Sequence, residues 1–282
     1  RNSDLQSRAI NTLEILASGG KIGRVSSPKF QPPKKITLLG SSYKVEKGEK
    51  IGVHTGILYL APANSSGIKR GDRSVNLCPW ATQGCRAGCL GENAGRMVMG
   101  SAANARLWKT ALYVAAPEIM REILILEIAA LERRAKRTGA TVAIRLDGTS
   151  DLALSEKFGL PKLFPSVAFY DYTKSAARIK NYNPENGVHY TFSASESADS
   201  PEGARAAISK GLSVAAIIPA GIAPDADKLA AAVLKMANAG VPVISGDDHD
   251  ARFTDAAGSI VWLGVKGGRK VEKLLAGMVF KV

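Results

Sequence analysis

The sequence predicts an α/β fold in which parallel strands and helices alternate to build a complete or partial (β/α) barrel. Two observations predict it. Short β-branched or aromatic runs recur about every 20 to 28 residues in the second half of the chain, the spacing of βαβ units. Polar residues follow nearly every run, and in a barrel such residues converge at the carboxyl ends of the strands. An open doubly wound sheet is the alternative architecture.

The first 50 residues predict an irregular N-terminal extension, followed by a barrel-like domain over residues 51–282. A loosely amphipathic pattern predicts a helix over 4–17, ended by Gly19 and Gly20. A Pro- and Lys-rich stretch over 28–35 is expected to be extended and exposed. Apolar runs over 36–39 and 57–60 predict strands, and the polar stretch over 64–76 predicts a loop.

The rest of the chain predicts an alternating order of elements. Helices are expected over 102–115 and 117–136, the second with Pro117 in its first turn and Glu118 at its positive end. Further helices are expected over 173–180, 200–210 and 225–239. With the run over 57–60, the predicted parallel strands number seven; the other six are 142–146, 167–170, 188–192, 214–218, 241–245 and 260–265.

The chain is strongly basic, with 38 Lys and Arg against 25 Asp and Glu and a formal net charge of +13 among 282 residues. Such a charge predicts nonspecific affinity for nucleic acid. Aromatic residues make up only 6%, so base-stacking platforms are scarce. No apolar run approaches the roughly 20 residues of a membrane span and no signal peptide is expected, so the sequence predicts a cytoplasmic protein without membrane contact.

The chemical centre of the sequence is the segment over 76–91, which holds Cys78, Cys85 and Cys89 in a C-x6-C-x3-C spacing. Thiolates select zinc, Cu(I) or iron–sulfur clusters. A [4Fe–4S] cluster usually takes four cysteines, so three would leave one iron open to a substrate or cofactor. This is the favoured interpretation. Zinc, with a fourth ligand from a histidine or carboxylate, is the alternative.

A strand, a three-cysteine loop and a helix at the start of a (β/α) repeat resemble the radical S-adenosylmethionine (radical-SAM) enzymes. That resemblance implies a partial or full TIM-like barrel, and a [4Fe–4S] cluster whose open iron chelates S-adenosylmethionine. The spacing differs from the C-x3-C-x2-C of that family. Asp147-Gly148-Thr149 stands where those enzymes carry a Gly-Gly-Glu motif.

The chain also resembles a family of bacteriophage and bacterial three-cysteine proteins. The shared blocks are LCPWATQGCRAGCLGENAGR and RLDGTSD, and the similarity runs from about Gly52 to the C-terminus. This resemblance implies no particular activity. For a phage-encoded protein it implies the host cytoplasm as location.

The strand-end residues supply the candidate catalytic groups, Asp147, Lys174 and His249. Arg145 and Asp147 alternate along one strand and should face the same side, where they could form an ion pair or bind a carboxylate. Thr149 and Ser195 join Arg145 and Asp147 as expected cofactor-binding residues. Taken singly, such Asp, Ser and Thr residues are more typical of helix N-caps, and only the repetition over five loops favours a pocket.

A Gly-rich turn with Gly267 and Gly268 opens the last predicted helix, beside Lys266, Arg269 and Lys270. Such a turn favours a phosphate or nucleotide. The sequence therefore predicts an iron–sulfur, radical-SAM-like enzyme whose substrate is a nucleotide, nucleic acid or other small molecule. The alternatives are a zinc-stabilised, non-catalytic nucleic-acid-binding protein and an iron–sulfur electron-transfer or sensor protein.

Overall fold

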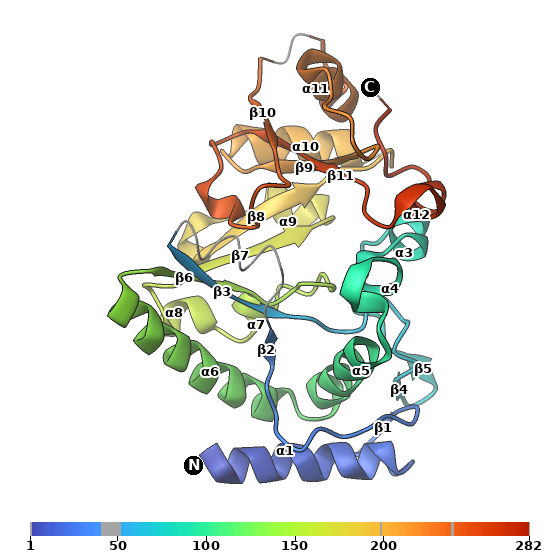
Figure 1. Cartoon of the computed structure of the whole chain (residues 1–282), viewed down its shortest axis with the longest axis vertical. Coiled ribbons are helices and arrows are strands. Elements are labelled where there is room, and N and C mark those ends of the chain that lie inside the picture. The colour runs from blue at the N-terminus through green and yellow to red at the C-terminus, as the bar shows by residue number, and fades with distance from the viewer. Residues whose placement is uncertain (1, 41–51, 198, 238–239, 282) are drawn as a thin grey trace.

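The computed structural model describes residues 2–40, 52–197, 199–237 and 240–281 (Figure 1). The predicted boundary between residues 50 and 51 lies outside these residues. The helix predicted over 225–239 ends already at Leu234, where Lys235 adopts a left-handed backbone conformation. None of the described helices is long and apolar enough to cross a bilayer.

An eight-stranded, mostly parallel sheet organises the chain, in the order β10-β11-β9-β8-β7-β6-β3-β2. Every neighbouring pair from β10 to β3 is parallel, and only β2 runs antiparallel at its end. The strands are β2 (Leu39–Gly40), β3 (Val53–Leu58), β6 (Thr141–Arg145), β7 (Ala168–Thr173), β8 (Val188–Ser193), β9 (Val214–Ile218), β10 (Val243–Ser245) and β11 (Ile260–Gly264). The predicted α/β class and its seven parallel strands are thus confirmed, and closure into a barrel stays a prediction.

Helices lie between successive strands, as expected of βαβ units. The longest are α1 (Asn2–Ala17), α5 (Gly100–Ala115), α6 (Pro117–Thr138), α10 (Ser200–Ser209) and α11 (Ala226–Leu234). The shorter ones are α3 (Gln83–Ala87), α4 (Leu90–Asn93), α7 (Leu154–Lys157), α8 (Leu160–Leu163), α9 (Ala176–Lys180), α12 (Gly268–Leu274) and the 3-10 turns η1 (Gly95–Val98), η2 (Pro184–Asn186) and η3 (Arg252–Thr254). Helix α1 packs against α5 and α6 (Figure 1), so the N-terminal segment joins the main core.

Several predicted elements differ from the structure. The strand expected over 36–39 is reduced to β2 (Leu39–Gly40), and the helix expected over 173–180 begins only at Ala176, because β7 continues to Thr173. The strand expected over 57–60 begins earlier, at Val53, because Gly56 is a strand residue packed against Leu39 and Ile144 rather than a turn. The loop expected over 64–76 contains two short strands, β4 (Lys69–Arg70) and β5 (Arg73–Ser74), which form a small antiparallel sheet with β1 (Val25–Ser26).

The two faces of the main sheet are covered differently. One face carries the large apolar core, to which Ile144, Phe192 and Val214 contribute from three strands. On the other face Val53, Ala143 and Tyr170 form a small cluster with Phe253 of η3. The connection between β10 and β11 therefore packs on this second face, and it brings polar residues of 247–255 onto the sheet.

Candidate functional site

The cysteine segment lies against the last helix and the C-terminal segment. Thr82 caps α3 by accepting a hydrogen bond from the Cys85 backbone amide (3.2 Å). A Cβ atom on Gly84 would lie 2.0 Å from the carbonyl oxygen of Ala276, and one on Gly88 would lie 2.5 Å from Leu275. Two of the three glycines of this segment therefore permit close packing on α12 and the residues after it.

Cys78 lies where β3 and β6 end. Its Sγ accepts a hydrogen bond from the Ala63 backbone amide (3.3 Å) and donates one to the carbonyl of Thr149 (3.5 Å). The Thr149 hydroxyl donates in turn to the carbonyl of Leu60. Thr149 thus fixes the loop after β6 against the chain that leaves β3, and its backbone contacts the first cysteine.

The three thiols lie within electrostatic range of one another. Burial, together with the charges of Cys89 and Cys85, raises the pKa of Cys78 to about 12. Burial also raises the pKa of Cys89 to about 11, and Cys85 again contributes. The pKa of Cys85 is raised by burial and lowered by the neighbouring Lys174. Without a bound cation, the thiols are held in the protonated form at neutral pH.

The donor set suits an iron–sulfur cluster by its chemistry, since three thiolates within one short segment are the ligands such clusters take. Within the described part of the chain, no three His, Cys, Asp or Glu side chains are arranged to hold one metal ion. A cluster does not demand that arrangement, because each thiolate binds a separate iron atom. The donor chemistry of the three thiols is compatible with a cluster, and Cys78, Cys85 and Cys89 are the side chains that would hold one.

Lys174 lies beside this group, at the end of β7. Its ammonium donates to the carbonyl of Ser193 at the end of β8 (3.0 Å), and it is electrostatically close to Cys85. Burial lowers its pKa. The predicted catalytic lysine and the predicted metal ligands thus lie together.

Asp151 is a neighbour of Lys174 that the sequence analysis did not single out. Its carboxylate accepts hydrogen bonds from the Lys174 backbone amide (2.9 Å) and the Thr173 hydroxyl (2.9 Å), and it forms an ion pair with Arg178. It is also close enough to raise the pKa of Cys85. Its place in the block RLDGTSD was the available signal, since acidic residues after a strand gather at the site.

The Asp147 side chain forms hydrogen bonds within the loop that follows β6. Its carboxylate accepts hydrogen bonds from the Ser150 hydroxyl (2.6 Å) and from the backbone amides of Leu152 and Leu154. Its backbone amide donates to Asp171 (2.8 Å), whose second carboxylate oxygen is buried without a partner among the described residues. Burial, followed by the nearby Asp147 charge, raises the pKa of Asp171 well above its ordinary value.

Arg145 forms its ion pair with Asp250 (3.1 Å) and not with Asp147, because the β10–β11 connection crosses the same face of the sheet. His249 belongs to this connection as well. Its Nδ1 lies 3.2 Å from the Arg252 guanidinium. Arg145 and His249 thus belong to the polar group of the β10–β11 connection, and Arg145 also donates to the Gly148 carbonyl (3.5 Å) in the loop after β6.

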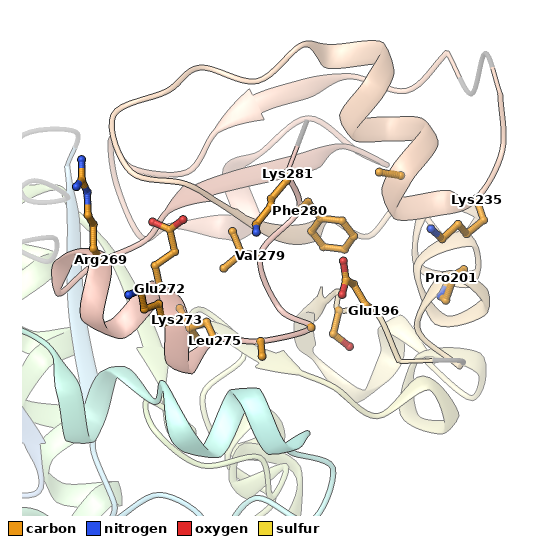
Figure 2. Close-up of a pocket in the computed structure, with 14 residues that line it drawn as sticks. Glu196, Pro201, Lys235, Arg269, Glu272, Lys273, Leu275, Val279, Phe280 and Lys281 are labelled. Atoms are coloured by element: carbon orange, nitrogen blue, oxygen red, sulfur yellow. The ribbon is translucent and has the colours of Figure 1, made fainter.

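Ser195 and the glycine pair lie farther along the sheet edge. Ser195 lines a pocket of about 820 Å³ between α10, α11 and the C-terminal segment (Figure 2). Gly267 and Gly268 have φ angles of +93° and +74°; Gly267 is the N-cap of α12 and Gly268 is its first residue. A Cβ on Gly267 would lie 3.0 Å from the carbonyl of Asn93, so this turn packs against the end of the cysteine segment.

Comparison with known proteins yields one match. A family model described as Gene product 88 matches residues 35–276, most of the chain and all of the residues described above as candidate site. Neither the curated proteins nor the solved structures contain a match. The match extends to the cysteine segment and the strand ends alike.

Proposed function

Since the chain belongs to the Gene product 88 family, whose name states no chemistry, we propose its function from its own residues: it binds a [4Fe–4S] cluster on Cys78, Cys85 and Cys89 and acts as a radical-SAM-like enzyme. The observation that carries the proposal is the meeting of three thiols with Lys174 and the strand-end loops at one edge of the parallel sheet. In parallel α/β sheets this edge is where ligands bind.

The protein's part is to hold and shield the bound groups. A site-open [4Fe–4S] cluster supplies one-electron reduction of a bound S-adenosylmethionine. Cys78 is oriented by the Ala63 amide and by the Thr149 carbonyl, and Cys85 packs against the apolar side chains around Leu275 and Met278. These contacts preorganise the thiols before a cluster binds, and they exclude water from one side of the cysteine segment.

Lys174 and the loop after β6 would contact the substrate or the amino-acid part of the cofactor. Lys174 is held by the Ser193 carbonyl and by the Asp151 contact to its own backbone amide. An ammonium fixed in this way supplies hydrogen-bond donors to a carboxylate at little cost in side-chain entropy. Its position beside Cys85 supports binding of an anionic group next to the open iron.

The test is to purify the protein without oxygen and to measure iron, acid-labile sulfide and zinc per chain. We expect a brown protein with about four irons and four sulfides, the content of one [4Fe–4S] cluster. Cys78→Ala, Cys85→Ala and Cys89→Ala should each lose the colour. Ser74→Ala, an exposed change just before the segment, is the control and should retain it.

The second measurement is the electron paramagnetic resonance spectrum of the reduced protein. S-adenosylmethionine should change this spectrum and should be cleaved to 5′-deoxyadenosine. A colourless protein with stoichiometric zinc would favour the zinc-stabilised, nucleic-acid-binding alternative. A cluster whose spectrum ignores S-adenosylmethionine, with no cleavage product, would leave electron transfer or sensing as the function.

A further inference from the structure

A pocket of about 820 Å³ lies beside Ser195, and the proposed cluster does not use it. It opens between α10, α11, α12 and the C-terminal segment, with Lys235 on one side and Arg269, Glu272 and Lys273 on the other (Figure 2). Its volume falls in the range of about 300 to 1,000 Å³ that small-molecule sites occupy. The pocket is therefore large enough for a ligand the size of a nucleotide.

The charged side chains that line the pocket carry an excess of positive charge. Four are cations and two are carboxylates: Lys235, Arg269, Lys273, Lys281, Glu196 and Glu272. Within the described ranges, none of these six side chains forms a hydrogen bond or an ion pair. Four cations that surround one hollow without protein partners favour an anion with several oxygens, such as a phosphate or diphosphate.

The remaining wall of the pocket is apolar. Leu275, Val279 and Phe280 contribute to it, and Figure 2 shows the Phe280 ring beside the Glu196 carboxylate. An apolar wall favours a flat ring system, and carboxylates accept hydrogen bonds from hydroxyl or amino groups. A phosphate, a ring and hydrogen-bond donors occur together in nucleoside phosphates.

We infer that this pocket binds a nucleoside phosphate, with the phosphates on the cations of the α12 side, Arg269, Lys273 and Lys281, and the ring against Val279 and Phe280. The site adjoins the cysteine segment, because Leu275 both lines the pocket and limits the space at Gly88. It contains none of the three cysteines. The inference therefore goes beyond the proposed function and does not depend on a cluster.

The test is isothermal titration calorimetry of the full chain with the four ribonucleoside 5′-diphosphates, the four nucleosides, pyrophosphate and a short single-stranded oligonucleotide. We expect at least one diphosphate to bind, and its nucleoside and pyrophosphate to bind about tenfold more weakly or worse, since each lacks one half of the contacts. The same titration on protein freed of iron by chelation should give the same affinity, which separates this site from the cluster.

A matched pair of double variants tests the assignment to the pocket. Lys273→Ala with Lys281→Ala should raise the Kd for the diphosphate about tenfold or more, as loss of charge-assisted contacts does. Lys157→Ala with Lys162→Ala removes the same charge from exposed positions on α7 and α8, far from α12 in Figure 1, and should leave the Kd unchanged. Thermal unfolding checks that all variants are folded.

Three results would overturn the inference. The first is the absence of diphosphate binding at millimolar concentration. The second is equal loss of affinity in the two double variants, which would show a general effect of net charge. The third is binding of the oligonucleotide or of pyrophosphate without binding of any diphosphate, which would assign the basic side chains to a polynucleotide or to a bare phosphate.

Discussion

The Arg145 guanidinium donates to the Asp250 carboxylate across 3.1 Å, and this contact joins the end of β6 to the connection between β10 and β11. Arg145 also lies over the Tyr172 ring, 4.5 Å from its centroid, and the Tyr170 hydroxyl donates to Asp250 (3.1 Å). Both charged side chains are largely buried, at 16% and 12% exposure. The pair fixes the polar connection on a face of the sheet that would otherwise be open.

Removing one partner of this pair should destabilise the fold. Asp250→Ala leaves a buried guanidinium without its carboxylate, so we expect the free energy of unfolding to fall by about 3 kcal/mol. Urea denaturation measures it. Glu202→Ala breaks the exposed Lys180–Glu202 pair and is the control, with stability close to that of the wild type. Equal effects of the two changes would contradict a structural role for Asp250.

Asp171 predicts a pH dependence of stability. Its pKa is raised in the folded state by burial, so the folded protein binds a proton there that the unfolded chain releases above about pH 4. The stability that this proton provides is present at low pH and is lost as pH rises through the folded pKa. Asn resembles a protonated carboxyl and can still accept the hydrogen bond of the Asp147 amide.

We therefore expect Asp171→Asn to unfold with a free energy equal to or above that of the wild type at neutral pH, and with a flatter pH profile. Urea denaturation between about pH 4 and pH 8 measures the profile. Asp225→Asn is the control, because the pKa of this exposed carboxylate is lowered by the Lys228 backbone amide and its effect appears only in acid. A steeper profile in Asp171→Asn would contradict the assignment of a proton to Asp171.

Gly84 predicts a steric effect at the cysteine segment. Gly84→Ala places a Cβ against the Ala276 carbonyl at 2.0 Å, so α3 must shift and we expect a loss of about 2 kcal/mol together with lower iron content after reconstitution. Gly100→Ala is the matched control, since a Cβ there has nothing within 4 Å, and we expect unchanged or slightly higher stability. Thermal unfolding and iron analysis of the two variants compare them directly. Full iron content in Gly84→Ala would show that the packing of α3 on the C-terminal segment does not position the thiols.

The strands that could be predicted from the sequence are those with continuous apolar runs. The run over 214–218 became β9 without change, because parallel strands are buried on both faces. The two-residue strands β4 and β5 carry only Lys, Arg and Ser, so no hydrophobic pattern in the sequence predicts them. Their pairing depends on the turn at Gly71, whose φ is +65°.

Contacts within the candidate site could be predicted from the sequence where the residues lie in loops that follow neighbouring strands. Lys174 follows β7 and contacts the Ser193 carbonyl at the end of β8, as expected of residues at the carboxyl ends of neighbouring parallel strands. The partner of Arg145 was not predictable, because Asp250 lies 105 residues away and reaches it through a connection that crosses the sheet face. Alternation along a strand identifies the face of a side chain, and it carries no information on which distant segment covers that face.

Lys174 offers a test of the proposed cofactor contact that is separate from cluster assembly. Its ammonium is held at the Ser193 carbonyl beside Cys85, so Lys174→Met removes hydrogen-bond donors next to the thiols without removing a metal ligand. We expect iron and sulfide contents to stay at the wild-type level. The S-adenosylmethionine concentration that gives half of the spectral change in electron paramagnetic resonance should rise about tenfold, as loss of one charge-assisted hydrogen bond predicts.

Lys210→Met is the matched control for this change. Lys210 also donates to a backbone carbonyl, that of Tyr182 (3.4 Å), but it is exposed and lies on the far end of α10 from the strand-end loops. It should leave both the cluster and the half-saturating concentration unchanged. If Lys174→Met loses iron, then the lysine supports the cysteine segment itself. If it retains both iron and the wild-type response to S-adenosylmethionine, then the cofactor's carboxylate binds elsewhere, and the argument from the position of Lys174 fails while the cluster assignment stands on the cysteines alone.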